Sequence, residues 1–365
     1  MPKPRLLPDT PAALGYSFPA EWTRHRATWF SWPRPEGISF PGKYHTVPEV
    51  LSRIFAAIAP REPVHVNVPN LNYEHLVRQQ LVDCGFPRRL LPRVHFHHIP
   101  TNENWCRDHG PAVVVHPSGK AAIVDWGFNA WGGKYPPYDA DDAVPTRIAE
   151  VLGLPLCYPG IVMEGGAIDV NGAGTLLTTT DCLLNPNRNP GLSRAEIERY
   201  LRDYYGQKHI CWLSGGIEGD DTDGHVDDLA RFISPRKVVI ALEDDPADAN
   251  YRPLRRARKQ LETLRDQDGR PFEIVELPMP RPVVHDGQRL PATYVNFYFV
   301  NGALLVPTYR DRRNDRRAVE TLQAHLPRHE VIGIDCTELI WGLGAIHCLT
   351  QQIPAYRIPQ PRRRR

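Results

Sequence analysis

Short apolar runs rich in β-branched residues alternate with longer stretches in which apolar residues recur every three or four positions. The short runs are bounded by Pro, Gly, Asn and Asp, which is typical of β-strands, and they cover residues 63–70, 112–117, 121–126, 174–185, 237–245, 272–280, 293–309 and 329–336. The longer stretches have the period of amphipathic helices, and they cover residues 46–60, 72–86, 142–154, 192–206, 250–269 and 315–327. Helices and strands are therefore mixed throughout, which predicts an α/β or α+β fold.

The helix at 192–206 has the clearest predicted start, because Ser193 precedes Glu196 by three residues in a capping-box pattern. Helix-then-strand units recur at irregular distances without an identity repeat. No stretch is long or polar enough to mark a domain boundary. We therefore predict a single domain built on a divergent structural repeat.

Composition narrows the class of protein. A chain of 365 residues with 41% hydrophobic and 24% charged content is typical of a globular protein with one large core. The sequence lacks a run of eighteen apolar residues and an apolar leader at its start, which predicts a cytoplasmic protein without a membrane partner. The terminal arginines account for the small positive net charge, so no nucleic-acid surface is indicated. Residues 359–365 are expected to form a disordered basic tail.

The cysteines are odd in number and lack the paired CxxC spacing of a redox or metal motif. A chain of this length needs no disulfide to fold, so we interpret all of them as reduced thiols that are free to react. They are Cys84, Cys106, Cys157, Cys182, Cys211, Cys336 and Cys348.

Four polar clusters lie on turn-like or Gly-rich segments, where reactive groups are usually presented. They are NWCRDHGP (104–111), MEGGAID (163–169), DDTDGHVDD (220–228) and GLGAIHCLTQQIP (342–354). Each has an ordinary explanation by itself: a turn or cap for Asp108, a solvated charge for Glu164 and burial for Cys348.

Taken together, the clusters supply the groups that attack on a guanidinium requires. A planar cationic guanidinium is held by charge-assisted hydrogen bonds to more than one carboxylate. A Cys thiolate can attack its central carbon, and a His can protonate the departing nitrogen and then deprotonate water.

The ordered set of motifs resembles the agmatine deiminase family, which belongs to the bacterial-type peptidylarginine deiminase group of guanidine-modifying enzymes. The resemblance spans roughly residues 17–356. Its motifs lie at residues 19–33, 104–111, 126–139, 163–169, 221–232, 293–309 and 344–354.

This resemblance implies a pentein fold, an α/β propeller of five αβ units around a pseudo-fivefold axis with the site in a central cavity. Residues 1–358 would then be a single catalytic domain. The implied activity is hydrolysis of agmatine to N-carbamoylputrescine and ammonia through a covalent Cys thiouronium, a reaction of polyamine biosynthesis that leads to putrescine. It requires a small guanidine as partner and no metal or organic cofactor, and family members are commonly homo-oligomers.

The resemblance also implies roles for individual residues. Cys348 matches the nucleophile and His225 the general acid/base, while Glu164 matches an acid that supports both His and guanidinium. Asp108 and Asp227 match the guanidinium-binding acids. The remaining matches are Trp105, which would line the pocket, and Gly342 and Gly344, which would shape the backbone beside the nucleophile.

Positions 225 and 227 are i and i+2, so we expect both side chains to reach one cavity from the same face of an extended segment.

Three positions depart from the family pattern or stay open. Ala345 replaces the usual Asn, which removes one polar group near the sulfur, and Cys106 places a second thiol near Asp108. Asp315 is expected to preserve the last acid of an otherwise altered motif.

The amine of agmatine requires a carboxylate or carbonyl-rich pocket, and the sequence does not rank the nearby acids Glu218, Asp220, Asp221 and Asp223.

Alternative functions remain at this point. The substrate could be arginine or peptidyl-arginine, or the enzyme could transfer the amidino group to an amine. A non-catalytic protein that binds a cationic ligand is a further alternative, although binding alone has no use for the thiol. His95 and His97 share one strand face and could hold a metal, and residues 220–228 could form a Ca²⁺ loop. We favour solvated or hydrogen-bonded histidines, and the loop lacks the EF-hand order.

Overall fold

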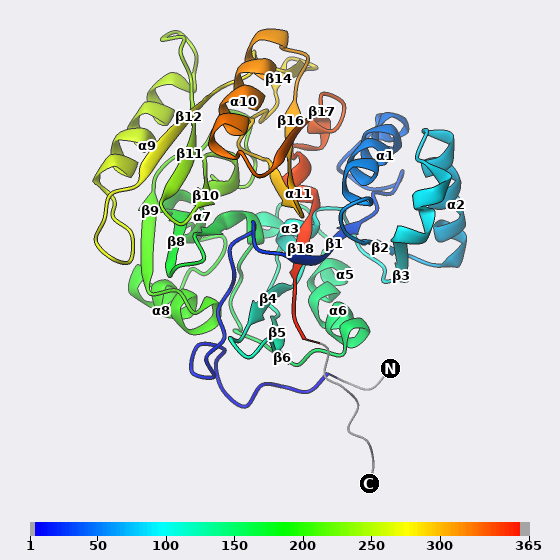
Figure 1. Cartoon of the computed structure of the whole chain (residues 1–365), viewed down its shortest axis with the longest axis horizontal. Helices are drawn as coiled ribbons and strands as arrows, with labels where there is room; N and C mark the ends of the chain where they lie inside the picture. The colour runs from blue at the N-terminus through cyan, green and yellow to red at the C-terminus, as the bar shows by residue number, and fades with distance from the viewer. Residues whose placement is uncertain (1–3, 358–365) are drawn as a thin grey trace.

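The structure is a computed structural model that describes residues 4–357 (Figure 1). The predicted basic tail at 359–365 lies outside the described residues. The mixed α/β class predicted from the sequence is confirmed. None of the helices in residues 4–357 combines the length and the apolar character that a membrane crossing requires.

Residues 4–357 contain five sheets of three or four strands, all with the same pairing pattern. Two antiparallel strands come first, and a further strand pairs in parallel with the second of them. The sheets, in pairing order, are β18 (Gln351–Pro354), β1 (His25–Ser31), β2 (Val64–Val68) and β3 (Val94–His98); β4 (Ala112–Val115), β5 (Ala121–Val124) and β6 (Leu156–Cys157); β7 (Ile168–Val170), β8 (Thr175–Thr179) and β9 (His209–Leu213); β10 (Ala230–Ser234), β11 (Lys237–Leu242) and β12 (Glu273–Pro278); and β15 (Tyr298–Val300), β16 (Ala303–Thr308) and β17 (Glu330–Asp335). Because β18 pairs with β1, the last sheet segment of the chain completes the first sheet.

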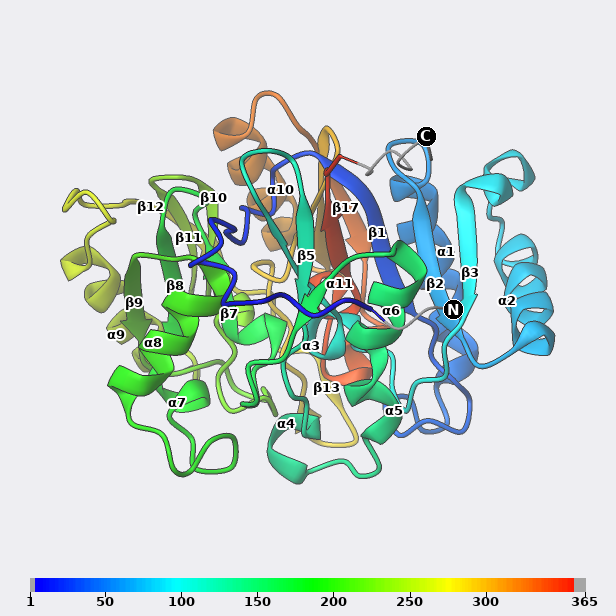
Figure 2. The same cartoon turned by 90° about the horizontal axis from the view of Figure 1, so that it is seen from below.

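Each parallel pair needs a crossover connection, and the longer helices provide it. They are α1 (Val47–Ile58), α2 (Leu71–Asp83), α6 (Val144–Leu152), α8 (Arg194–Tyr205), α9 (Tyr251–Thr263) and α10 (Arg312–His325). All six were predicted from the apolar period, and the capping box of Ser193 and Glu196 is present. These helices lie around the periphery, so that α8 and α9 are at one end and α1 and α2 at the other (Figure 2).

Two short helices, α3 and α11, lie in the middle of the molecule between the sheets (Figures 1 and 2). The short helices are α3 (Cys106–His109), α4 (Ala130–Gly133), α5 (Asp139–Asp142), α7 (Thr180–Leu183) and α11 (Ile346–Leu349). The 3₁₀ turns are η1 (Tyr44–Thr46), η2 (Arg88–Arg93), η3 (Gly165–Ala167), η4 (Val226–Asp228) and η5 (Ile340–Gly342), and a separate hairpin is formed by β13 (Val284–His285) and β14 (Gln288–Arg289).

Helix α1 illustrates how the apolar residues of a predicted amphipathic helix are buried in the core. Val50, Ile54 and Phe55 are almost fully buried in the large hydrophobic core, where Phe55 packs on Phe30 of β1. Burying such a side chain stabilises the fold by roughly 1.5–3 kcal/mol. The helices are therefore held by their inner faces around a central region that is left for polar residues.

Two runs predicted as single strands each contain two elements. Residues 293–309 hold β15 and β16, which a turn at Asn301 and Gly302 separates, and Gly302 adopts a φ of 78° that favours glycine. Residues 174–185 hold β8 followed by α7.

Candidate active site

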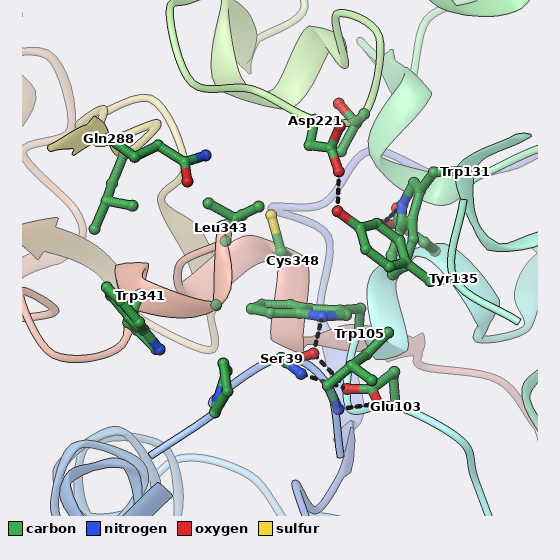
Figure 3. A pocket seen from close by; sticks show the side chains of 17 residues that line it. Ser39, Glu103, Trp105, Trp131, Tyr135, Asp221, Gln288, Trp341, Leu343 and Cys348 are labelled. Atoms are coloured by element: carbon green, nitrogen blue, oxygen red, sulfur yellow. Dashed lines mark hydrogen bonds between the residues drawn. The ribbon is translucent and has the colours of Figure 1, made fainter. Parts of the chain in front are cut away.

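A cavity of about 230 Å³ lies beside α3 and α11 (Figure 3). The sulfur of Cys348 lies above the indole of Trp105, and Trp131 and Tyr135 stand on the opposite side from Leu343 and Trp341 (Figure 3). The lining residues are Ile38, Ser39, Pro41, Glu103, Trp105, Asp108, Trp131, Tyr135, Asp221, Thr222, Gln288, Leu290, Trp341, Gly342, Leu343, Gly344 and Cys348.

The polar groups of this region come from equivalent places in the five sheet units. Each lies on the segment just before the first strand of its unit. Asp108 precedes β4, Glu164 precedes β7, His225 and Asp227 precede β10, Asn296 precedes β15, and Cys348 precedes β18. Every unit therefore contributes to one centre.

Cys348 lies in α11 with only 6% of its surface exposed. Its Sγ accepts a hydrogen bond from Asn296 Nδ2 at 3.1 Å and lies 3.9 Å from Asp227 Oδ2. Burial raises the pKa of the Cys348 thiol well above its ordinary value, and the carboxylates of Asp227, Asp228 and Asp108 raise it further. The sulfur is thus held as a thiol in a strongly anionic site.

The two predicted glycines pack where a side chain would not fit. A Cβ on Gly344 would lie 2.5 Å from the ring of Trp105 and 3.0 Å from Cys348 Cβ. A Cβ on Gly342 would lie 2.6 Å from Phe40 and 2.8 Å from Trp105. Close approach to the Trp105 indole therefore requires glycine at both positions.

Asp108 is fixed by one donor on each carboxylate oxygen. Gly166 N–H donates to Oδ1 and Trp131 Nε1–H donates to Oδ2, both at 3.0 Å. Trp131 and its neighbour Ala130 are held at φ values of 55° and 52°, in a left-handed conformation that is costly for residues with a Cβ. Burial raises the pKa of Asp108 to about 6, and the charge of His225 and the Trp131 hydrogen bond oppose that rise.

We expect kcat/KM for a cationic guanidine to fall as the pH drops below about 6, because protonated Asp108 carries no charge to pair with the cation. Trp131→Phe removes the hydrogen bond that lowers this pKa, so the acid limb should move to higher pH. Trp341→Phe is the control, since Trp341 lines the cavity and its indole nitrogen has no hydrogen-bond partner among residues 4–357. Identical acid limbs in the two variants would refute this role of Trp131.

Asp227 is held by His347, a residue that the sequence did not single out. His347 Nδ1 lies 2.6 Å from Asp227 Oδ2, and its Nε2 lies 2.8 Å from Glu21 Oε2. A carboxylate therefore faces each ring nitrogen of His347. Burial opposes ionisation of Asp227, but the hydrogen bond and charge of His347 hold its pKa below its ordinary value. Arg231 and Arg107 lie 2.9 and 3.3 Å from Glu21 and balance its charge.

Glu164 and His225 are almost fully buried and each retains a free polar atom. Glu164 Oε1 accepts from Arg188 Nε at 2.6 Å, whereas Oε2 has no partner within the described residues. His225 Nδ1 lies 3.8 Å from Asp108 and 3.9 Å from Asp227, and Nε2 has no partner there either. These atoms remain available to a ligand.

All eight predicted site residues meet here, but the spacing argument for two of them was wrong. His225 and Asp227 do not lie on an extended segment, because His225 caps η4 and Asp227 lies inside it. The preceding Asp223 and Gly224 have positive φ, and they turn the chain so sharply that no extended segment forms. Both side chains nevertheless reach the same centre through this turn.

Asn296 supplies a polar group beside the sulfur, although the family's usual Asn is missing at Ala345. Its Oδ1 accepts from the backbone N–H of His347 at 3.0 Å, so its Nδ2 must face Cys348, Asp227 and Asp228. A lone Asn inside the apolar run TYVNFYFV was the one sequence signal for it.

The acids considered for the far end of a ligand are mostly committed elsewhere. Asp221 alone among Glu218, Asp220, Asp221 and Asp223 lines the cavity, where it bonds Tyr135 and Lys134. Asp220 accepts from the N–H groups of Thr222 and Gly224, and Asp223 pairs with Arg188 and Lys134.

The histidines considered as metal ligands, His95 and His97, are not among the residues that line the cavity. His97 Nε2 is hydrogen-bonded to His65 Nδ1 at 2.8 Å, and the pair packs on Trp29. Neither His95 nor His97 joins a group of three ligand atoms within residues 4–357.

Fold and centre together define a class of protein: a mixed α/β protein that surrounds a buried thiol with carboxylates and a histidine. The chain belongs to the Porphyromonas-type peptidyl-arginine deiminase family, which matches residues 17–354. This confirms the family resemblance predicted from the sequence.

Individual relatives agree with this assignment. The chain is 40% identical to the agmatine deiminases of Pseudomonas syringae pv. tomato and Pseudomonas aeruginosa, over 96% of this chain and 98% of each relative. The solved agmatine deiminase of Enterococcus faecalis is 34% identical with a TM-score of 0.89, over 96% of this chain and 99% of that one. The C. jejuni agmatine deiminase is 31% identical with a TM-score of 0.81, over 94% and 97%.

Proposed function

We propose that this protein is a deiminase that hydrolyses the guanidinium group of agmatine to N-carbamoylputrescine and ammonia. The observation that carries the proposal is a buried thiol that faces a cavity beside ionisable carboxylates and a histidine with an unpartnered nitrogen. The relatives named agmatine deiminase, at about 40% identity over nearly the full chain, support it.

The guanidinium is held between Asp108 and Asp227. Asp227 Oδ1 has no protein partner within the described residues, so it can accept from a substrate N–H. The positive charge of the bound substrate offsets the carboxylates that suppress ionisation of Cys348, so the thiol loses its proton to His225 only when substrate is present.

Cys348 thiolate then attacks the central guanidinium carbon and forms a C–S bond. His225 passes the proton to one substrate nitrogen, which leaves as ammonia, and a covalent thiouronium remains. His225 next takes a proton from water, and the hydroxide adds to the same carbon. The C–S bond then breaks while the added hydroxyl gives its proton to the released ammonia, which leaves the neutral ureido product, ammonium and the Cys348 thiolate. The proton on His225 returns to the sulfur, so the enzyme is regenerated. Glu164, whose Oε2 is free, orients His225 and the guanidinium through this cycle.

The cavity lining favours agmatine over arginine. It carries the acids Glu103 and Asp221, and no Lys, Arg or His lies among the described lining residues. The second cation of agmatine can therefore meet Glu103 or Asp221, of which Asp221 also pairs with Lys134. The α-carboxylate of arginine meets no cation among these lining residues and would be desolvated there.

The pseudo-fivefold pentein arrangement, with residues 1–358 as one catalytic domain, is part of this proposal. It is supported by the five sheets with one pairing pattern and by the five equivalent segments that supply the site. A solved amidinotransferase from Microseira wollei, 11% identical with a TM-score of 0.50, supports the likeness of fold alone.

The test is an assay of ammonia and ureido product with agmatine, arginine, a methylated arginine and a peptidyl-arginine, without any amine acceptor. We expect equal amounts of ammonia and N-carbamoylputrescine from agmatine and much less product from the others. Activity that appears only when an amine acceptor is added would indicate amidino transfer, and no turnover of any guanidine would refute the proposal.

A further inference from the structure

Three buried side chains, Glu164, Cys182 and His225, lie close together, and the proposed hydrolysis uses only Glu164 and His225. One ligand atom each of Glu164, Cys182 and His225 lies within 4.8 Å of the other two. Glu164 and Cys182 are fully buried and His225 is 1% exposed. Carboxylate, thiolate and imidazole are the three ligand types that bind zinc in proteins. Cys182, which lies inside the short helix α7 after β8, has no part in the proposed reaction.

Two of these side chains carry polar atoms that nothing in the described protein satisfies. Glu164 Oε2 and His225 Nε2 are buried and lack hydrogen-bond partners. Their other atoms are committed: Arg188 holds Glu164 Oε1 at 2.6 Å, and His225 Nδ1 faces Asp108 and Asp227. Buried polar atoms without partners are rare in native proteins, and they point to a ligand that completes them.

We propose that Glu164, Cys182 and His225 form an inhibitory Zn²⁺ site whose occupation withdraws His225 from proton transfer. The inhibitory role rests on the proposed function, while the binding site itself does not. Zinc bonds of about 2.0–2.3 Å place tetrahedral ligand atoms roughly 3.3–3.6 Å apart, so small side-chain rotations close the present spacing. The thiol proton of Cys182 is released to solvent on binding, and a fourth position stays open to water.

The surrounding charge favours a dication at this place. Asp108 and Asp227 lie within 4 Å of His225 Nδ1, and Arg188 is the neighbouring cation that balances Glu164. The anionic field that attracts a guanidinium therefore also attracts Zn²⁺. Entry is from the cavity, because Asp108 lines it and lies next to His225.

A second group of ligand atoms, from Asp227, Asp228 and Cys348, is a weaker candidate. Each of its side chains already has a partner, although Asp227 Oδ1 is free within the described residues: His347 occupies Asp227 Oδ2 at 2.6 Å, and Asn296 Nδ2 donates to Asp228 at 2.9 Å and to Cys348 at 3.1 Å. Zinc would have to displace these hydrogen bonds, whereas at Cys182 it would satisfy free atoms.

The test replaces zinc by Co²⁺, whose bond to a thiolate gives a charge-transfer band in the near ultraviolet. The full chain carries Cys348→Ala, so the nucleophile cannot contribute. We expect one Co²⁺ with a thiolate band, loss of the band on adding Cys182→Ala, and its retention with Cys106→Ala, a matched buried thiol. Zn²⁺ should displace the cobalt.

Absence of the band in Cys348→Ala protein, or its persistence in the Cys182→Ala double variant, would overturn the site. These readouts need no turnover, so they are independent of the proposed function. In otherwise wild-type protein, Cys182→Ala should keep guanidine turnover and weaken Zn²⁺ inhibition at least tenfold. Equal inhibition of Cys182→Ala and wild type would contradict the inhibitory role.

Discussion

Replacement of Cys348 by alanine is expected to lower guanidine turnover by roughly 10⁴-fold or more, the scale seen when a covalent nucleophile is removed. The loss is large because hydrolysis without the thiolate would need direct attack of water on a resonance-stabilised cation. Substrate should still bind, since Asp108 and Asp227 are unchanged. Ammonia release and equilibrium binding of agmatine, measured on the same protein, separate the two effects.

Cys211→Ala is the matched control for this loss. Cys211 is also buried, in β9, and donates weakly to the carbonyl of Arg265 at 3.4 Å. Its replacement should leave turnover intact and cost about 1 kcal/mol of stability, as small core truncations do. Near-normal ammonia release by Cys348→Ala would exclude the covalent pathway.

Asp227→Asn is expected to reduce kcat/KM by roughly 10²–10³-fold, because it removes one charge of a buried, hydrogen-bonded pair. His347 keeps Asp227 ionised, so the substitution deletes a real negative charge beside the bound guanidinium. It also leaves His347 with one carboxylate partner in place of two. Steady-state kinetics with agmatine across pH measures the loss.

Asp228→Asn provides an adjacent control of the same chemistry. Burial, together with the charge of Asp227, raises the pKa of Asp228 well above its ordinary value, so Asp228 holds its proton more readily than Asp227 and contributes less negative charge. An amide of the same shape can accept the hydrogen bond from Asn296, and the expected loss is less than about tenfold. Equal losses in the two variants would show that the charge assignment of this pair is wrong.

The fold could be predicted from the sequence where the spacing of apolar residues alone determines the secondary structure. The outer helices bury a regular apolar stripe, as in α1, so their positions follow from spacing alone. Strands β1 and β18 were harder, because Gln351 and Gln352 are polar yet almost fully buried. Their burial depends on pairing between the two ends of the chain, which local pattern does not contain.

The candidate site residues could be predicted from sequence motifs, but the contacts between residues far apart in the sequence could not. Glu21 and His347 bond at 2.8 Å although they are 326 positions apart, and each lies in a segment with an ordinary local explanation. Asn296 could not be identified from the sequence either. A single amide in an apolar run indicates a role in the site only once the structure places it against Cys348. Equivalent placement before the first strand of each unit explains why these distant residues converge.

The covalent thiouronium on Cys348 is the central claim, and the mass of His225→Asn protein mixed with agmatine tests it most directly. Without His225 the adduct should form slowly and then persist, because no base activates the water that removes it. The account predicts a mass increase of one agmatine less one ammonia, carried by the peptide that contains Cys348 and absent from His225→Asn/Cys348→Ala. Unmodified protein that releases ammonia at the wild-type rate would contradict it.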